Sequence, residues 1–355
     1  MNADGGSFVI PVVLGDEGLG TVKYMIHVEE YEAMWIKSKK FLRSVNNMDR
    51  ETIVVGIDHG WKNMKTVNST FSSGVKELTR LPAIFENVLE YNEKYYRVDG
   101  ERMEVKANKV QDDSFYLLTL AALGKELNRR GLQEAHVLLA VGLPLTRFGE
   151  ERDDFIDYLR QQKEVEFRFE KKHYHVWIER VSVYPQCYAA VVNRIQNFPN
   201  RVLIVDIGSW TVDVMPIINR SPDESICVTK PNGVITCMQE INKECVKQIN
   251  EEIDEMDIER VIIEGPDFLP KKYQDIVVPA LQDYCKKIYH FIRELGYNME
   301  LTPVFFVGGG AVLMKQFGEL RNDNISYIED IRANARGFEA LGKVYLDRVV
   351  NRNAE

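Results

Sequence analysis

One local pattern occurs twice in this chain, and it limits the folds that the chain can adopt. The first copy is VVGIDHGWKNMK, in which Asp58 and Gly60 follow an apolar run. The second is LIVDIGSWTVD, in which Asp206 and Gly208 stand in the same places, 206 − 58 = 148 residues later. Each copy predicts a buried strand, a tight turn at Asp-x-Gly and a strand that returns beside the first. The repetition therefore predicts two related units that face each other.

Strands alternate with helices through both halves of the sequence. The β-branched run 52–57 predicts a buried strand, whereas apolar residues at helical spacing predict helices at 115–131, 234–253 and 270–296. Residues 1–50 are predicted to form two strands and a short helix. A chain of 355 residues is long enough for two domains. We therefore expect the α/β class, with two closely apposed domains.

The turns of the two copies suit the phosphate groups of a nucleotide. Gly60 and Gly208 lack a Cβ, so backbone N–H groups there can approach phosphate oxygens and form an anion-binding nest. Lys65, on the returning strand, can neutralise the β- or γ-phosphate. Asp58 and Asp206 can hold Mg²⁺ through its water molecules, because Mg²⁺ loses water reluctantly. One copy alone is more often a plain turn, so the interpretation depends on finding two in matching contexts.

A third turn, rich in glycine, supports the same interpretation. Gly308, Gly309 and Gly310 follow an apolar run and precede a predicted helix. Such a turn admits a flat ring or a phosphate, and a helix N-terminus favours negative charge. By itself a glycine turn before a helix is an ordinary entry turn, so it counts only together with the two Asp-x-Gly copies.

Charge and composition exclude several classes of protein. The chain has 45 Lys and Arg against 54 Asp and Glu, a formal net charge of −9, which argues against a general nucleic-acid binder. No apolar run reaches the ~18–20 residues of a membrane span, and the first residues do not resemble a signal peptide. Five cysteines without a CxxC pair are typical of free thiols in a reducing cytosol. We therefore expect a cytoplasmic protein that contacts neither nucleic acid nor a membrane directly.

Six segments together resemble the actin-like ATPases of bacterial plasmid segregation, the ParM family, within the actin/Hsp70/sugar-kinase superfamily. They occur in the family's order and cover about residues 52–350. The segments are GIDHGWKNMKT (56–66), VGLPLT (141–146), YPQCYAA (184–190), VDIGSWTVD (205–213), FFVGGGA (305–311) and NARGFEALG (334–342).

The resemblance implies an actin-like fold of two duplicated RNase H-like α/β domains around a nucleotide cleft. Domain I would span 51–195 and be completed by a C-terminal helix at 331–355, domain II would span 196–330, and 1–50 would be an N-terminal extension. It also implies binding of ATP or GTP with Mg²⁺, head-to-tail polymerisation, and hydrolysis that destabilises the filament. Plasmid DNA would be moved through a ParR-like DNA-binding adaptor.

The same resemblance assigns roles to individual residues. Asp58 and Asp206 would organise Mg²⁺ and act in catalysis, and Gln186 would orient the attacking water, because an amide positions water but is not a strong base. Gln186 can alternatively shape the helix start after Pro185. The nucleotide-binding residues would be Gly60, Trp61, Lys62, Asn63, Lys65, Gly208, Ser209, Trp210, Thr211, Gly308, Gly309 and Gly310.

Some features depart from the family or permit another interpretation. Trp61, Lys62 and Trp210 stand where the family carries smaller residues, and the two tryptophans can stack on a nucleotide or crowd it. Residues 1–50 can form a filament contact, an adaptor site or a plain surface extension. The alternative function is a small-molecule kinase of the same superfamily, which needs a further carboxylate as general base.

Three further features are weaker candidates for a functional role. His173 and His175 alternate along a predicted strand, so they can face one metal ion or lie on an exposed hairpin. His59 can contact a phosphate or only shape its turn. The acidic segment 251–259 is interpreted as a solvated surface run.

Overall fold

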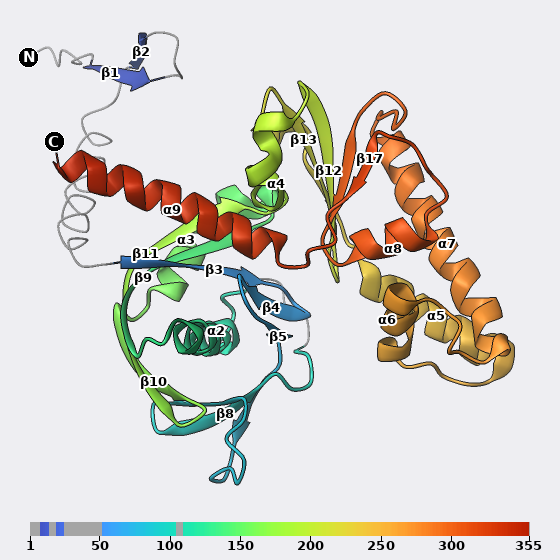
Figure 1. Cartoon of the computed structure of the whole chain (residues 1–355), viewed down its shortest axis with the longest axis horizontal. Helices are drawn as coiled ribbons and strands as arrows, with labels where there is room; N and C mark the ends of the chain where they lie inside the picture. The colour runs from blue at the N-terminus through green and yellow to red at the C-terminus, as the bar shows by residue number, and fades with distance from the viewer. Residues whose placement is uncertain (1–7, 14–18, 25–51, 104–108, 355) are drawn as a thin grey trace, which may run out of the picture.

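The computed structural model describes residues 8–13, 19–24, 52–103 and 109–354. Within them two β-sheets stand side by side with helices on their faces (Figure 1). The α/β class is therefore confirmed. A separate antiparallel pair, β1 (Phe8–Val13) and β2 (Leu19–Tyr24), matches the two strands predicted in the N-terminal segment. The helix predicted to follow them lies outside the described residues.

The first sheet is built around three parallel strands that carry the apolar runs of the first half. In spatial order its strands are β5 (Thr70–Ser72), β4 (Asn63–Thr66), β3 (Thr52–His59), β9 (Glu134–Leu143), β11 (Lys172–Pro185), β10 (Glu164–Phe169), β7 (Val88–Tyr91), β8 (Lys94–Val98) and β6 (Val75–Leu78). Strands β3, β9 and β11 are parallel. Strand β4 folds back antiparallel on β3, so Asp58 pairs with Lys65.

Helices cover both faces of this sheet because its central strands are apolar on both sides. Helices α2 (Ser114–Arg130) and α3 (Leu145–Leu159) pack on one face, and α9 (Ala333–Ala354) lies across the other (Figure 1). Successive side chains of a strand point to opposite faces. In β3, Val55 therefore packs with α2, whereas Val54 packs with Phe338 of α9.

The second sheet repeats the plan of the first. In spatial order its strands are β14 (Ser221–Pro222), β13 (Val212–Ile218), β12 (Arg201–Ile207), β16 (Val304–Val307) and β17 (Ile325–Tyr327), with β15 (Val228–Lys230) paired to β13. Strands β12 and β13 form an antiparallel hairpin in which Asp206 pairs with Asp213. Strand β12 is also parallel to β16, as β3 is to β9. The internal repeat in the sequence is thus a repeat in topology.

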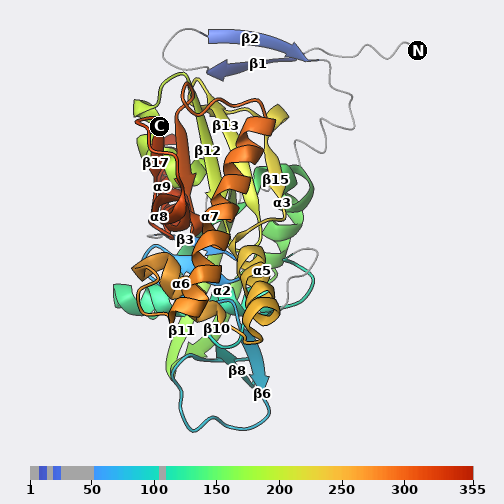
Figure 2. The ribbon, with the colours of Figure 1, turned by 90° about the vertical axis from the view of Figure 1, so that its right-hand side faces the viewer.

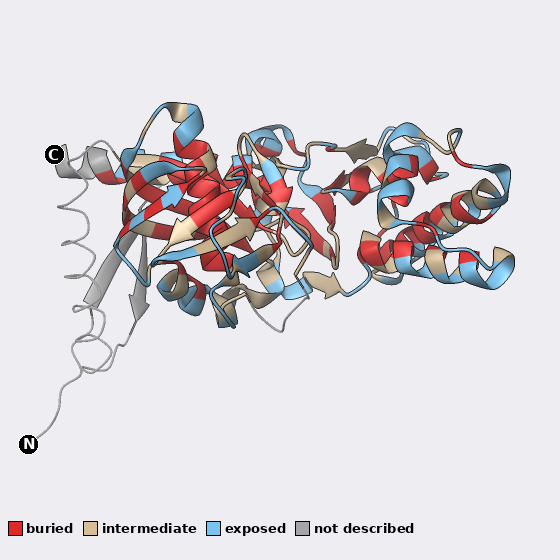
Figure 3. Ribbon diagram, turned by 90° about the horizontal axis from the view of Figure 1, so that it is seen from below, coloured by how far each residue is buried: buried red, intermediate tan, exposed pale blue. Residues whose placement is uncertain are grey.

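Helices also cover both faces of the second sheet. One face carries α5 (Val234–Ile249), α6 (Glu255–Glu264), α7 (Lys271–Glu294) and α8 (Gly310–Phe317), and the other carries α4 (Tyr188–Val191) and the 3₁₀ helix η1 (Val192–Asn197). A short 3₁₀ turn, η2 (Glu224–Ile226), follows β14. Figure 2 shows α7 lying along this sheet, with α5 and α6 on either side of its lower part. Buried residues concentrate in the strands and in the helix faces that cover them (Figure 3).

Glycine ends two helices where the sequence predicts it. Gly131 follows α2 with φ +70°, and Gly296 lies just beyond α7 with φ +84°. This left-handed conformation is favourable for glycine and closes the last helical turn. Among the helices in the described part of the chain, none has the length and apolar character needed to span a membrane.

Candidate functional site

A cavity of about 490 Å³ lies between the two sheets, at the turns of the two Asp-x-Gly hairpins. This volume is in the range of pockets that enclose a small ligand. The predicted site residues that line it are Asp58, Gly60, Trp61, Lys62, Asn63, Lys65, Gln186, Asp206, Gly208, Ser209, Trp210, Thr211, Gly308 and Gly309. The fold therefore brings together side chains from β3, β4, β11–α4, β12 and the β16–α8 turn.

Gly310 is the predicted site residue that does not line the cavity. A Cβ at this position would overlap the side chain of Ile207 on the neighbouring strand. This glycine allows the start of α8 to pack on β12, and a ligand contact at Gly310 stays a prediction.

Asp58 lies in a polar cluster at the end of β3. Its side chain is buried, with an exposed fraction of 3%. Lys65 Nζ donates to its Oδ2 at 3.1 Å, and Gln186 Nε2 donates to its Oδ1 at 3.0 Å. Burial alone would raise the pKa of Asp58, but Lys65 and Lys109 outweigh burial and hold the pKa below its usual value. Asp58 is therefore a carboxylate, and Gln186 lies directly beside it.

Asp206 occupies the corresponding place at the end of β12, in a different electrostatic environment. Asn334 Nδ2, at the start of α9, donates to its Oδ2 at 2.9 Å. The residue opposite it in the hairpin is Asp213, whose carboxylate accepts from Thr211 and Thr229. Burial and the charge of Asp213 raise the pKa of Asp206 to about 6. A bound cation would relieve this accumulation of negative charge.

The open backbone donors of the turns lie beyond the predicted glycines. The amide of Gly60 donates to the carbonyl of Asp58, and the amide of Gly208 donates to the carbonyl of Thr211. These two N–H groups therefore stabilise the turns themselves. Within the described residues, the amides of Ser209 and Trp210 have no hydrogen-bond acceptor, and neither do those of Trp61 and Lys62 in the first turn. All four can therefore donate to an anion.

Charged pairs connect loops beside the first sheet with α6, which packs on the second sheet. Arg102 contacts Glu255 through two hydrogen bonds, of 2.9 and 3.3 Å, and Lys62 forms an ion pair with Glu259. The guanidinium of Arg102 also lies 5.7 Å from the ring centre of Trp210. The interpretation of 251–259 as a solvated surface run agrees with the exposure of Glu251, Glu252 and Asp257. Glu255 and Glu259 are only partly exposed, and they join the halves of the molecule.

The two loop tryptophans lie at opposite sides of the cavity. The ring of Trp61 meets Phe115 edge-on at 5.0 Å and packs on the core of the first sheet. Trp210 belongs to the second hairpin, and its buried indole N–H has no partner among the described residues. Trp61 is thus held by its own core, whereas Trp210 keeps a free donor at the cavity wall.

Comparisons with known proteins agree with this arrangement. Residues 56–188 match the family model of the actin-like protein N-terminal domain, and residues 204–319 match the C-terminal domain of the archaeal MreB-like actin homologue. The archaeal actin homolog Ta0583 in complex with ADP superposes with a TM-score of 0.66 and 19% identity, covering 82% of this chain and 100% of that one. The chain has an actin-like fold.

Two further structures extend the likeness. ParM of Bacillus thuringiensis with ATP has a TM-score of 0.63 and 14% identity, covering 83% of this chain and 99% of that one. The Alp12 filament structure has a TM-score of 0.63 and 15% identity, covering 82% of this chain and 98% of that one. A comparison with curated proteins finds no significant match. At these identities the likeness establishes the actin-like fold alone.

The cavity is also lined by residues that were not predicted from the sequence. An apolar wall is formed by Val234, Ile235 and Met238 of α5, Ile262 and Ile263 of α6, and Val312 of α8. In the sequence these side chains are ordinary positions on amphipathic helices. Lys109 and Asn334 were also missed as site residues. Asn334 is the first residue of the NARGFEALG segment, so the resemblance could have indicated it.

The histidine candidates take structural places. His59 is fully buried, its Nε2 lies 2.9 Å from Thr119 Oγ1, and its ring packs edge-on against Phe115 and Phe155. Burial lowers its pKa to about 3, so the imidazole is neutral. His173 and His175 pair with Glu166 and Glu164 on the neighbouring strand. The described residues hold no cluster of three or more metal-binding side chains.

Proposed function

We propose that this actin-like protein binds ATP or GTP with Mg²⁺ in the cavity and assembles into filaments whose stability is controlled by hydrolysis. The single observation that supports this best is the pair of hairpins, which bring Asp58 and Asp206 to one cavity from two sheets of the same topology. The likeness to proteins described with ADP, with ATP and as a filament supports the same function.

The donor set at the hairpins fits a hydrated magnesium ion. Asp58 and Asp206 supply carboxylate oxygens, and Asn334 adds a buried Oδ1 that has no partner among the described residues. Mg²⁺ prefers oxygen ligands and usually retains several waters. When bound, the ion would supply positive charge that neutralises the phosphates. Because Lys65, Gln186 and Asn334 already contact the carboxylates, we expect the protein to hold the ion mainly through water.

The remaining roles follow from what each group can donate or accept. The amides of Ser209 and Trp210 would bind phosphate oxygens, and Lys65 would keep Asp58 ionised and oriented through their 3.1 Å ion pair. Gln186 would position the attacking water, since its amide is fixed by Asp58 and has a carbonyl oxygen to accept from that water. The apolar wall of α5, α6 and α8 would receive the base.

The biological role that we propose is the segregation of plasmid DNA through a ParR-like adaptor. The formal net charge of −9 disfavours direct binding to DNA, so an adaptor would make that contact. Self-association into head-to-tail filaments and a cytoplasmic location belong to the same proposal.

Sedimentation of the full chain with Mg²⁺ and ATP, GTP or no nucleotide tests the function, with phosphate release followed in the same samples. We expect nucleotide-dependent pelleting, and we expect Asp206→Asn to lower phosphate release by about 10²-fold or more, as losing a transition-state charge partner does. Asp283→Asn is the matched control, because Asp283 pairs with Lys287 on the exposed side of α7.

Two outcomes would contradict the proposal. Nucleotide turnover without assembly at any concentration would favour the small-molecule kinase, and a substrate screen would follow. Absence of nucleotide binding by the unmodified chain would reject both functions.

A further inference from the structure

The cations that line the cavity differ in one respect, which is whether a carboxylate already holds them. Lys62 pairs with Glu259, Lys65 with Asp58, and Arg147 with Glu151. Lys109 also lines the cavity, but its ammonium forms no ion pair with any residue that the structure describes. Lys109 is therefore the lysine of the cavity lining that can form a new ion pair with a negatively charged ligand.

Aromatic rings hold the Lys109 side chain. Its Nζ lies 6.0 Å from the ring centre of Phe115, at the start of α2, and 5.9 Å from that of Phe155, in α3. Cations at such distances from ring faces are attracted by the ring quadrupole, but the rings do not neutralise the charge. The ammonium is thus oriented at the cavity, and no carboxylate of the described residues is in contact with it.

Burial without a paired carboxylate makes this ammonium costly. Burial lowers the pKa of Lys109 to about 8, although the charges of Asp58 and Glu151 oppose the change and Arg147 and Lys65 add to it. A phosphate oxygen beside Lys109 would restore the favourable interaction that burial removes.

The position of Lys109 relates it to one end of a bound nucleotide. Lys109 lies with α2 and α3 of the first sheet, whereas the apolar wall belongs to α5, α6 and α8 of the second. The two groups of helices lie in different halves of the molecule (Figure 1). Asp58 and Asp206 stand between them at the hairpin turns. A nucleotide with its base on the apolar wall would direct its last phosphate toward Lys109.

We infer that Lys109 binds the terminal phosphate of a nucleoside triphosphate and so distinguishes the triphosphate from the diphosphate. This inference rests on the proposed function and names a specificity residue for it. Lys65 and Lys62 are held by carboxylates of the protein, so they contribute similarly to both nucleotides. Lys109 gains a partner only when the third phosphate is present.

Binding measurements on the full chain test the inference, with AMPPNP and ADP as the probes in the presence of Mg²⁺. We expect Lys109→Met to weaken AMPPNP binding by about 10- to 100-fold, the scale of a lost charge-assisted hydrogen bond, and ADP binding by less than about twofold. Lys109→Arg should recover most of the preference. Lys94→Met removes the same charge at an exposed site where Lys94 pairs with Glu77, and it should change neither affinity.

The outcomes separate the inference from the function beneath it. Unmodified protein that binds neither probe would reject the proposed function itself. Unmodified protein that binds both, together with a Lys109→Met variant that loses both equally or neither, would reject the role of Lys109 alone. Circular dichroism melts check that the variants fold. Lys109→Gln, which keeps a polar head group, is measured in parallel, and an unchanged preference for AMPPNP in it would also overturn the inference.

Discussion

Corresponding residues of the two hairpins carry opposite charges. Lys65 faces Asp58 in the first hairpin, and Asp213 faces Asp206 in the second. The first carboxylate is therefore paired by its own hairpin, whereas the second is crowded by a like charge and its pKa rises to about 6. The first hairpin thus presents a neutralised carboxylate to the cavity, and the second presents two carboxyl groups whose negative charges are not balanced by a cation of their own hairpin.

Gly308 is the residue on which the position of Asp206 depends most directly. It has φ +81°, and a Cβ there would overlap Asp206 Oδ1. We expect Gly308→Ala to lower the free energy of unfolding by about 1–3 kcal/mol through backbone strain and to displace the carboxylate, weakening nucleotide binding. Urea unfolding and a nucleotide titration measure both effects.

The neighbouring glycine supplies the control for stability. Gly309 has φ −62°, and a Cβ there would meet no atom within 4 Å. Gly309→Ala is expected to leave the free energy of unfolding nearly unchanged. Equal destabilisation by the two substitutions would show that the overlap with Asp206 is not the cause.

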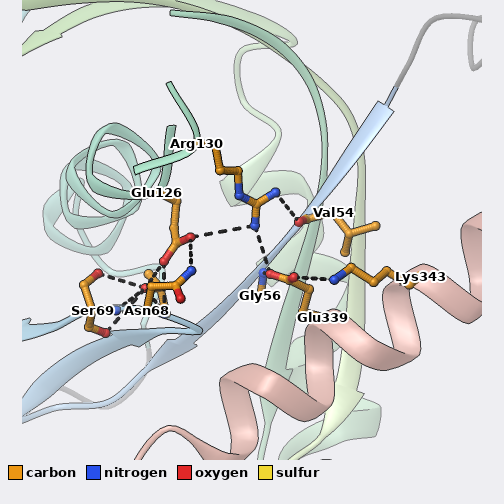
Figure 4. Close-up of polar contacts among 9 residues, drawn as sticks. Val54, Gly56, Asn68, Ser69, Glu126, Arg130, Glu339 and Lys343 are labelled. Carbon is orange, nitrogen blue, oxygen red and sulfur yellow. Dashed lines mark hydrogen bonds and ion pairs between the residues drawn. The ribbon is translucent and has the colours of Figure 1, made fainter. Parts of the chain in front are cut away.

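At the scale of elements, α9 packs the C-terminal part of the chain against β3 and is joined to α2 by polar contacts. Glu339 of α9 accepts from Arg130 of α2 at 3.1 Å, and the same guanidinium donates to the carbonyl of Val54 on β3 at 3.0 Å (Figure 4). Lys343, one turn later in α9, donates to the other oxygen of Glu339 at 2.7 Å. The polar contacts thus join α2 and α9 around β3, an inner strand of the first sheet.

Arg130 and Lys343 both bind Glu339, but they differ in exposure. The side chain of Arg130 is 24% exposed and that of Lys343 is 60% exposed. We expect Arg130→Met to cost about 1–3 kcal/mol, because it removes a buried charged partner from Glu339 and a donor from the carbonyl of Val54. Lys343→Met should cost less than about 1 kcal/mol, as exposed pairs do. Thermal and urea unfolding of the two variants decide the matter, and equal losses would contradict a structural role for the buried contacts.

At the scale of the whole molecule, the pairs Arg102–Glu255 and Lys62–Glu259 connect loops beside the first sheet with α6 of the second half. Each pair is partly exposed, so we assign it only about 0.5–1 kcal/mol. Two such pairs are nevertheless enough to shift an opening equilibrium. Their charges are also screened by salt.

Removing the glutamates of both pairs tests this connection. We expect Glu255→Gln combined with Glu259→Gln to increase the open population of the nucleotide-free protein by about 5- to 30-fold, which corresponds to the loss of about 1–2 kcal/mol. Small-angle scattering would then give a larger radius of gyration for the variant at low salt.

The control comes from the same helix. Glu264 also lies on α6, but it pairs with Arg260 of its own helix on the exposed face. Glu264→Gln should leave the scattering unchanged. A double variant that scatters like this control would mean that Arg102–Glu255 and Lys62–Glu259 do not hold the two halves of the molecule together.

The sequence by itself determined the α/β class, the two hairpins and the set of loops that meet, because strand and turn preferences act over a few residues and the repeat stated them twice. The packing of Gly310 against Ile207 could not be predicted, because a glycine that admits a ligand and one that admits a neighbouring strand look alike in sequence. Lys109, Glu259 and the apolar wall were decided by tertiary structure alone. Their contacts join residues far apart in the chain, and local patterns carry no information about which lysine finds a carboxylate and which is left facing the cavity.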